Sequence, residues 1–248
     1  MNAYNPFSLE NKTILITGAS SGIGRRTAIE CSKMGANLII TGRNSQRLQE
    51  TLDGLEEGNH QMMCADLTVE QDLKTLVVGC PLLDGVFLCA GIVDTTLVKF
   101  YNQTKLQMVF DTNYFSVALL TKELLSKKKL NKGASLVYMS SYGAEKVEPG
   151  LGIYSASKMA INALVLTVAK ENVARKIRAN AIMPMMIDTE MTQNNDSLSQ
   201  EDMQKDMSKY PFGYGKPEDV AYAAIYLLSD ASRWMTNSYI KMDGGSNL

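Results

Sequence analysis

Histidine is almost absent from this sequence. Its net charge is close to zero, and it lacks long apolar runs. His60 is the only histidine. Its isolation excludes a metal site built from histidine ligands and a hydrolase that depends on a Ser-His-Asp triad. The net charge of -1 and the pI of about 5.9 do not indicate a protein that binds nucleic acid. We therefore expect a small-molecule partner and no bound metal.

Cysteine is also sparse, and no pair of cysteines has CxxC spacing. Cys31, Cys64, Cys80 and Cys89 fall in apolar stretches, which predicts buried small hydrophobic residues rather than a disulfide or a metal set. Met1–Glu10 lacks the basic start and the apolar stretch of a signal peptide, and no later run is long enough to span a bilayer. We expect a cytoplasmic protein that does not contact a membrane.

The 248 residues, 45% of them apolar, fit a single α/β domain with a large core. Apolar segments of strand length alternate with longer segments of helical periodicity. The expected strands are Thr13–Thr17, Asn37–Thr41, Gln61–Cys64, Val86–Cys89, Ser135–Met139, Arg178–Ile182 and Tyr239–Met242. This alternation predicts a Rossmann-type, doubly wound parallel sheet of about seven strands, with helices on both faces and ligands at the carboxyl ends of the strands.

Two expected helices, Thr104–Ser126 and Ile153–Arg175, are apolar on nearly all sides. One side of each can pack on the sheet, whereas the other would face water in a monomer. We expect a homo-oligomer, either a dimer or a tetramer; cover by neighbouring helices is the alternative. Residues 185–210 show no clear periodicity, and we expect them to form a substrate lid within the single domain 1–248.

A glycine-rich turn follows the first expected strand and precedes a helix expected over Ile23–Met34. The turn contains Gly18, Ser20, Ser21, Gly22, Ile23 and Gly24. The first glycine permits the turn, the second lets the backbone approach a phosphate, and the third lets the helix pack closely on the sheet. The serines add hydroxyl donors, and the start of the helix attracts an anion. The order of strand, turn and helix predicts a dinucleotide site, although such glycines also occur as ordinary turn chemistry.

The residues after the second expected strand bear on the choice of dinucleotide. An acidic residue there would hold the 2′-hydroxyl of NAD, but the sequence has Thr41, Gly42 and Arg43. A guanidinium can hold a 2′-phosphate through paired, charge-assisted hydrogen bonds. We expect NADP(H) to be preferred and NAD(H) to be possible; a solvated loop arginine is the alternative interpretation.

Tyr154 and Lys158 are four residues apart on the same expected helix, so their side chains lie on one face. A free tyrosine titrates near pH 10. We expect the ammonium group of Lys158, together with an oxidised nicotinamide, to lower the pKa of Tyr154, so that it gives a proton in reduction and accepts one in oxidation. Ser141 ends an expected strand and can polarise a carbonyl oxygen without attacking it.

The pattern TGxxxGxG, then Asn113, Ser141 and YxxxK, resembles the short-chain dehydrogenase/reductase superfamily over nearly the whole chain. The resemblance implies that Tyr154 is the general acid/base, that Ser141 orients the substrate and that Lys158 binds the nicotinamide ribose. It also implies that Asn113 holds a water molecule for a proton relay. These four residues form the expected catalytic tetrad.

The resemblance implies further cofactor contacts. They fall on Asp66, Leu67, Ala90, Gly91, Pro184, Ile187 and Thr189, in addition to Tyr154 and Lys158. Two departures from the family pattern stand out: Leu88 and Cys89 replace two asparagines, and Met185 replaces a glycine. Neither departure removes a member of the tetrad, so both bear on the substrate more than on the reaction. The substrate pocket is expected to be walled by Tyr142, Val147, Gly150, Met185, Met186 and the segment to Tyr210; ordinary packing of the methionines is the alternative.

These residues predict an NADP(H)-dependent oxidoreductase that reduces a carbonyl to an alcohol, or the reverse. The alternatives are a 3-oxoacyl-(acyl carrier protein) reductase, a non-catalytic NADP-binding regulator, and a lyase or epimerase. A complete tetrad argues against a regulator. A basic run could dock an acidic carrier protein, although a solvated helix end, with cations that complement its dipole, is the better explanation. That run comprises Lys127, Lys128, Lys129 and Lys132, with Arg175 and Lys176 after the next helix.

Overall fold

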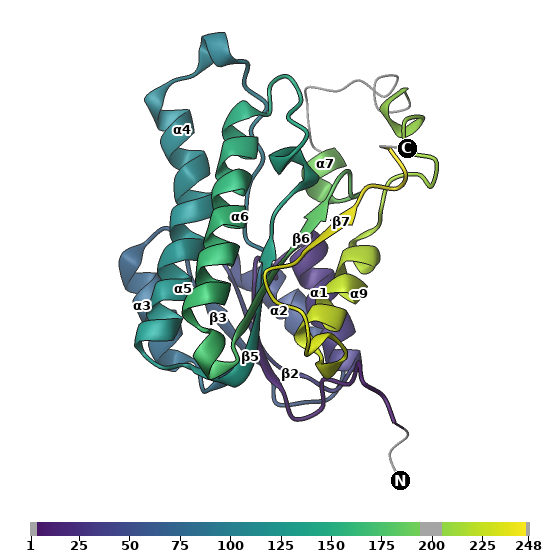
Figure 1. Ribbon diagram of the computed structural model, residues 1–248. Coiled ribbons are helices and arrows are strands. Elements are labelled where there is room, and N and C mark those ends of the chain that lie inside the picture. The colour runs from purple at the N-terminus through teal and green to yellow at the C-terminus, as the bar shows by residue number, and fades with distance from the viewer. Residues whose placement is uncertain (1–3, 194–204, 247–248) are drawn as a thin grey trace.

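A parallel sheet forms the central layer of the protein, as seen in a computed structural model that describes residues 4–193 and 205–246 (Figure 1). Its seven strands lie in the order β3-β2-β1-β4-β5-β6-β7, and every neighbouring pair is parallel. The strands are β1 (Thr13–Thr17), β2 (Asn37–Gly42), β3 (Gln61–Cys64), β4 (Leu83–Leu88), β5 (Leu130–Met139), β6 (Arg178–Pro184) and β7 (Tyr239–Met242). The predicted single-domain Rossmann-type fold is confirmed.

Helices cover both faces of the sheet (Figure 1). They are α1 (Gly22–Lys33), α2 (Ser45–Asp53), α3 (Glu70–Gly79), α4 (Gln103–Phe110), α5 (Ser116–Ser126), α6 (Gly152–Glu171), α7 (Glu190–Gln193) and α9 (Pro217–Leu228). Helices α3, α5 and α6 contribute to the hydrophobic cluster on one face. Helices α1, α2 and α9 contribute to the cluster on the other.

The alternation of side chains along β1 explains why its sequence is continuously apolar. Leu15 belongs to the cluster on the α3, α5 and α6 side, whereas Ile14 and Ile16 belong to the opposite cluster. All three are fully buried, because successive residues of a strand point to opposite faces and both faces are covered. Each such burial contributes about 1.5 to 3 kcal/mol relative to an exposed side chain.

Some predicted boundaries were wrong. β4 begins at Leu83 rather than Val86 and ends before Cys89. β5 begins at Leu130, where the prediction began at Ser135, because polar residues hide the start of the strand. The pairing of β4 with β5 shifts register between Leu83 and Gly85, an irregularity that hydrophobic periodicity does not reveal. The predictions for β2 and β6 were one and two residues too short at their carboxyl ends.

The predicted helix over Thr104–Ser126 is interrupted. A π-helical segment, Asp111–Phe115, joins α4 to α5, and π segments inside helices often mark functional sites. The predicted helix over Ile153–Arg175 ends earlier, since α6 stops at Glu171 and a short 3-10 turn, Val173–Arg175, follows it.

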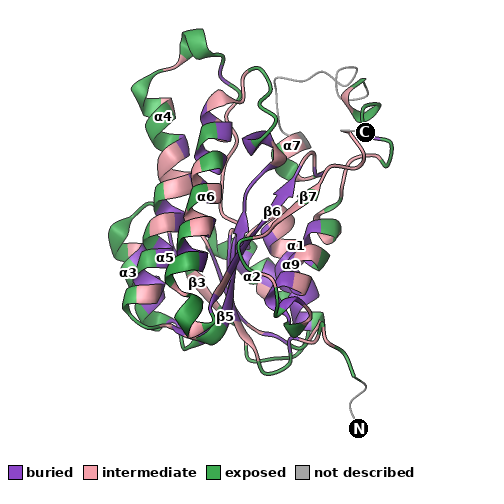
Figure 2. Cartoon of the chain, in the orientation of Figure 1, coloured by how far each residue is buried: buried purple, intermediate pink, exposed green. Residues whose placement is uncertain are grey.

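Helix α6 is buried along one side only, and both α4–α5 and α6 present exposed residues (Figure 2). The large apolar side chains exposed on these helices include Leu106, Met108, Phe115, Leu119 and Met159. By length and composition alone α6 could cross a membrane. It packs on the sheet and buries the Lys158 side chain, which identifies it as a core helix.

Candidate active site

A cavity of about 930 Å³ opens at the carboxyl ends of the strands. β1 lies between β2 and β4, so the chain order reverses there, and open α/β sheets bind ligands at such a point. Of the predicted site residues, the following line this cavity: Gly18, Ser20, Ser21, Gly22, Ile23, Gly24, Arg43, Asp66, Leu67, Ala90, Gly91, Ser141, Tyr154, Lys158, Pro184, Ile187 and Thr189. Asn113 lies behind the cavity wall.

The glycine turn adopts a backbone conformation that side chains at its glycine positions would obstruct. Gly18 and Gly22 have φ values of +67° and +50°, which glycine adopts without strain. A side chain at Gly24 would place its Cβ 2.2 Å from the carbonyl oxygen of Gly18, and one at Gly18 would approach Ala90 to 3.0 Å. Within the described chain no side chain caps the start of α1, so its first amides face the cavity. This cradle fits the pyrophosphate of a dinucleotide.

Thr17 ties the two loops of the cradle together, and the sequence analysis missed it. Its hydroxyl accepts hydrogen bonds from the backbone N–H groups of Cys89 and Ala90, at 3.0 and 3.1 Å. The threonine is buried at the carboxyl end of β1. A buried hydroxyl residue at the end of an otherwise apolar strand was the signal that could have identified it.

Arg43 and Asp66 line the cavity just after β2 and β3. Arg43 is exposed, and its carbonyl accepts a hydrogen bond from the thiol of Cys64. Partial burial raises the pKa of Asp66, but hydrogen bonds from Thr68 and the charge of Arg43 outweigh it and lower the pKa overall. Cys64 is exposed, so the prediction that all cysteines are buried was wrong at this position, because β3 is an edge strand.

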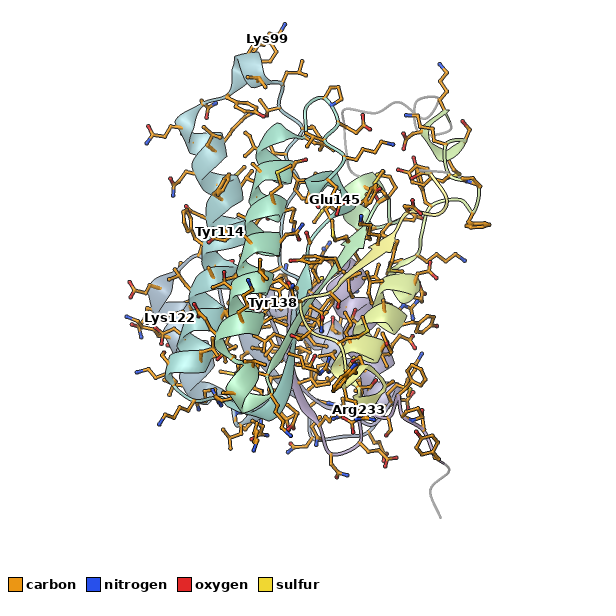
Figure 3. The ribbon with its side chains drawn as sticks, in the orientation of Figure 1. Lys99, Tyr114, Lys122, Tyr138, Glu145 and Arg233 are labelled. Carbon is orange, nitrogen blue, oxygen red and sulfur yellow. The ribbon has the colours of Figure 1, made fainter. Side chains whose placement is uncertain are left out.

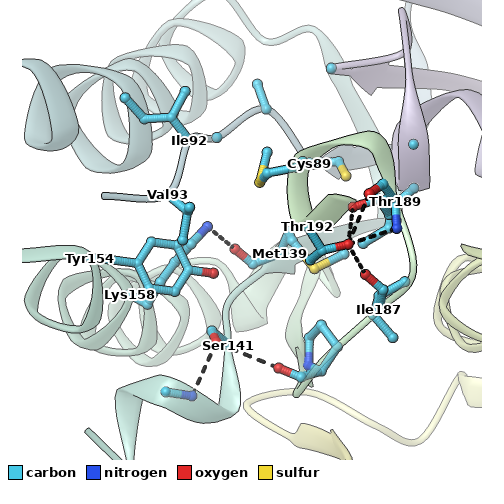
Figure 4. Close-up of a pocket in the computed structure, with 18 of the residues that line it drawn as sticks. Cys89, Ile92, Val93, Met139, Ser141, Tyr154, Lys158, Ile187, Thr189 and Thr192 are labelled. Atoms are coloured by element: carbon cyan, nitrogen blue, oxygen red, sulfur yellow. Dashed lines mark hydrogen bonds between the residues drawn. The ribbon is translucent and has the colours of Figure 1, made fainter. Parts of the chain in front are cut away.

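Ser141 presents its hydroxyl at the reacting end of the cavity (Figure 4). Its oxygen accepts a hydrogen bond from the N–H of Gly143 at 3.0 Å, and its proton points toward the carbonyl of Pro184 at 3.5 Å. The contact with Pro184 is long for a hydrogen bond between oxygen atoms. A substrate oxygen can therefore replace it at little cost while Gly143 keeps the hydroxyl in place.

Tyr154 and Lys158 face the cavity together, and the Nζ of Lys158 lies 5.7 Å from the centre of the Tyr154 ring (Figure 4). The ammonium group donates to the carbonyl of Met139 at 2.8 Å. Burial raises the pKa of Tyr154, and the hydrogen bond with Ser141 opposes this only in part. Burial also lowers the pKa of Lys158 to about 8. The expected lowering of the tyrosine pKa is thus not found, because desolvation of the phenol exceeds the effect of its polar neighbours.

Asn113 acts on the loop after β4 rather than on the cavity itself. Its side-chain amide donates to the carbonyl of Ile92 at 2.9 Å and accepts from the N–H of the same residue at 2.8 Å. It also donates to the hydroxyl of Ser157 on α6. A side chain at Gly91 would come within 3.2 Å of the Asn113 amide oxygen and 3.5 Å of Lys158 Nζ. Asn113 therefore fixes this loop against α6.

Of the residues that depart from the family pattern, Cys89 and Met185 line the cavity, whereas Leu88 is buried in the hydrophobic core. Burial raises the pKa of the Cys89 thiol to about 12, and the nearby charge of Lys158 opposes this only in part, so the thiol stays protonated. The N–H of Met185 donates to the carbonyl of Met242, which holds Met185 at the end of β6. Of the expected pocket walls, Gly150, Met185 and Met186 line the cavity, and Tyr142 and Val147 do not.

Helix α7 forms a strap over the phosphate cradle, a second feature that the sequence analysis missed. A side chain at Gly22 would have its Cβ 3.6 Å from the methyl group of Thr189. The next residue, Glu190, forms an ion pair with Arg47 of α2 at 2.9 Å. The expected lid, residues 185–210, includes this strap, while residues 194–204 lie outside the described part of the chain.

The described residues contain no group of three or more histidine, cysteine, aspartate or glutamate side chains that could hold a metal ion. The polar side-chain groups at the Tyr154 end of the cavity include the hydroxyl of Ser141, the phenol of Tyr154 and the ammonium group of Lys158. Tyr154, Ser141 and Lys158 can orient a carbonyl or alcohol group and move its proton.

Comparison with known proteins gives similarity over almost the whole chain. A family profile described as Enoyl-(Acyl carrier protein) reductase matches residues 18–247. The 3-oxoacyl-(acyl-carrier-protein) reductase FabG of Rickettsia felis is 32% identical over 96% of this chain and 97% of that protein. The protein of the same name from Thermotoga maritima is 31% identical over 96% and 98% of the two chains.

Solved structures agree with these relatives. A short-chain dehydrogenase/reductase family protein, 30% identical, superimposes with a TM-score of 0.84 over 96% of this chain and 98% of the other. A glucose/ribitol dehydrogenase of the same type from Brucella melitensis, 26% identical, has a TM-score of 0.90 over 98% and 100% of the two chains. With its parallel sheet, glycine cradle and Tyr154-Lys158 pair, the chain belongs to the short-chain dehydrogenase/reductase family, a family of oxidoreductases that interconvert alcohols and carbonyls with NAD(P).

Proposed function

We propose that this protein is an NADP(H)-dependent oxidoreductase that reduces a carbonyl to an alcohol, or catalyses the reverse, with Tyr154 as the general acid/base. One observation carries the proposal: Tyr154, Ser141 and Lys158 line the same cavity as the glycine cradle. A bound nicotinamide supplies the hydride in reduction and accepts it in oxidation. The residues of this chain supply the proton, the orientation of the substrate and the charge that supports the transfer.

In reduction the substrate oxygen takes the place of the Pro184 carbonyl as the acceptor of the Ser141 proton. This hydrogen bond polarises the carbonyl group while Gly143 holds the serine oxygen. Tyr154 then donates its proton to the oxygen as negative charge develops there. The raised pKa of Tyr154 keeps the phenol protonated near neutral pH but makes it a weaker acid, so the proton transfer depends on stabilisation of the phenolate. The ammonium group of Lys158 stabilises the phenolate that remains.

The preference for NADP(H) rests on Arg43. Its side chain is exposed beside the cradle and lines the cavity, and no carboxylate follows β2 at the position that would hold a 2′-hydroxyl. A 2′-phosphate would gain a charged partner there, whereas NAD(H) would gain none. The cysteines are free thiols, which suits a cytoplasmic enzyme.

A 3-oxoacyl-(acyl carrier protein) reductase is the second candidate, because proteins of that name match almost the full chain. The basic run gives this candidate little support within one subunit. The lysines of the run lie just before β5 and at its amino end. Glu145, four residues after Ser141, lies at the other end of the sheet (Figure 3). Two of its members also serve the fold, since Lys129 donates to the carbonyl of Cys80 and Arg175 to that of Leu130.

The test is NADPH oxidation with the purified protein and a panel of small ketones, keto sugars, quinones and 3-oxoacyl thioesters. We expect at least one carbonyl class to be reduced, faster with NADPH than with NADH. If NADPH binds but none of these carbonyls is reduced, and no alcohol is oxidised with NADP, a binding regulator is the better description.

A further inference from the structure

Beyond the glycine cradle, the cavity continues into a second region. Loops around Tyr154 enclose this region. These loops follow β4, precede α6 and follow β6. The first two touch, since a side chain at Gly150 would bring its Cβ within 3.1 Å of the carbonyl oxygen of Thr95. Val93 lines the same cavity as Tyr154 and Lys158 (Figure 4). This region is the place for the part of the substrate next to the reacting carbon.

Among the described residues, half-buried apolar side chains form much of the wall of this region, whereas Asp206, which is also half-buried, contributes a carboxylate at the rim. The apolar ones are Ile92, Val93, Leu151, Met185 and Met186. The hydroxyl groups of Ser141 and Tyr154 face the cavity at its reacting end. In the proposed mechanism both of them hydrogen-bond to the same substrate oxygen, so neither is left to pair with another polar group of the substrate. A methionine where the family pattern has glycine adds apolar bulk to this wall, and methionine adapts its shape to irregular apolar groups.

The charged side chains of the region lie at its rim and balance one another. Lys146, Glu148 and Lys209 are exposed. Asp206 accepts a hydrogen bond from Lys209 at 2.9 Å and another from the hydroxyl of Tyr214 at 2.9 Å. Among the residues that the structure describes, this rim therefore carries two lysines and two carboxylates, with no excess charge of either sign.

This composition discriminates between carbonyl compounds. Each hydroxyl group that a substrate buried against these walls without a partner would lower kcat/KM by about tenfold. Each methylene group buried there would raise it by about two- to fourfold. The hydroxyl groups of a keto sugar would therefore lower its kcat/KM, whereas the methylene groups of a compound with an alkyl chain would raise it.

We infer that the substrate carries apolar substituents on the carbonyl carbon, as an alkyl ketone or a 3-oxoacyl chain does, and is not a keto sugar. The inference rests on the proposed function and narrows it. The shared feature is the apolar chain beside the carbonyl group, which a free ketone or a thioester-borne acyl group can supply.

The experiment compares kcat/KM along two series with saturating NADPH: methyl ketones of increasing chain length, and N-acetylcysteamine thioesters of 3-oxo acids of increasing chain length. Butanone and erythrulose, which share one carbon skeleton, form the polar comparison. We expect kcat/KM to rise about two- to fourfold per methylene in at least one series, and butanone to exceed erythrulose by at least about tenfold. The better series identifies the source of the chain. A preference for erythrulose, or no dependence on length in either series, overturns the inference.

A variant and a binding measurement complete the design. Met185→Gln should reduce the gain per methylene at least by half and leave the Kd of NADPH within about twofold of the unmodified value. Leu82→Gln is the matched control, since Leu82 is exposed just before β4 at the opposite end of the sheet, and it should change neither quantity. Straight-chain alkyl amides, titrated calorimetrically onto the NADPH complex, should bind more tightly as they lengthen. Because binding needs no turnover, failure of this inference is distinguishable from failure of the proposed function.

Discussion

Burial dominates the electrostatics of the two titrating residues of the active site. It raises the pKa of Tyr154 and lowers that of Lys158 to about 8, since a low-dielectric site disfavours the charged form of either group. At neutral pH the phenol is protonated and the ammonium group still carries its charge. The pair is therefore prepared for proton donation, and the tyrosine becomes a base only with further positive charge in the cavity.

The pH dependence of reduction follows from these directions. The pKa of Tyr154 is raised, so the phenol is not the first group to lose its proton as the pH rises; Lys158 is, at about pH 8. We expect kcat/KM for reduction to be level below that pH and to fall by up to tenfold per pH unit above it. A steady-state profile at saturating NADPH measures this, and a level profile well past pH 9 would show that the charge of Lys158 does not matter.

The proposed preference for NADP(H) depends on Arg43. Arg43→Ala should weaken NADPH binding by about 10- to 100-fold, the loss expected for charge-assisted hydrogen bonds to a phosphate, and leave NADH within about twofold. Fluorescence titration of both cofactors measures the two Kd values. Arg233→Ala is the control, since Arg233 is an exposed arginine that does not line the cavity. Equal losses for both cofactors would show that Arg43 does not contact the 2′-phosphate.

Among the elements, α7 affects the cofactor cradle through the charge of Glu190. Glu190 places a carboxylate in the wall of a cavity that receives phosphates, and Arg47 neutralises it across the groove from α2. Both side chains are about half exposed, so the pair contributes modestly. The main effect of the Arg47–Glu190 pair is to offset the repulsion between the Glu190 carboxylate and the phosphates of the cofactor.

The expected result is a specific pattern in a double-mutant cycle. Arg47→Ala should weaken NADPH and NADH alike by about two- to fivefold, because it exposes the charge of Glu190 to the pyrophosphate that both share. Glu190→Gln alone should cost nothing, and Arg47→Ala with Glu190→Gln should restore the original affinity. If the double variant binds as weakly as Arg47→Ala, or if only NADPH is affected, Arg47 touches the cofactor directly.

The elements also show what a sequence reveals and what it hides. β1, β3 and β7 match their predicted bounds, since periodicity and flanking turns are local signals. The π segment around Asn113 and the register shift near Gly85 are invisible to periodicity. Motif order predicted the residues that meet in the cavity. The Arg47–Glu190 pair joins residues far apart in the chain, and the pKa of Tyr154 depends on burial, so neither could be derived from spacing.

At the scale of the whole molecule, α4, α5 and α6 present exposed apolar residues that an interface with another molecule would bury. Phe115 and Leu119 are 44% and 50% exposed, and Met159 on α6 is 44% exposed. Exposed apolar patches of this kind mark interaction surfaces, and a second copy of the chain offers the same surface in return. This face is separate from the cavity, so assembly would leave the active site open.

We therefore expect a dimer or tetramer at micromolar concentration, and we expect Leu119→Glu to shift it toward smaller species, because a buried unpaired charge is costly. Light scattering coupled to size-exclusion chromatography measures the mass. Leu82→Glu places the same charge on an exposed apolar residue away from these helices and should leave the mass unchanged. A monomeric unmodified protein would mean that this face has another use.

The central claim is that Tyr154 gives the proton in a carbonyl reduction that this fold catalyses with NADP(H). The most direct test is Tyr154→Phe, assayed for NADPH affinity by fluorescence and for reduction of the best carbonyl substrate. The account predicts a Kd within about twofold of the unmodified protein and a kcat lower by about 10² to 10⁴, the usual contribution of general acid/base catalysis. Turnover that survives unchanged with the hydroxyl removed would contradict it.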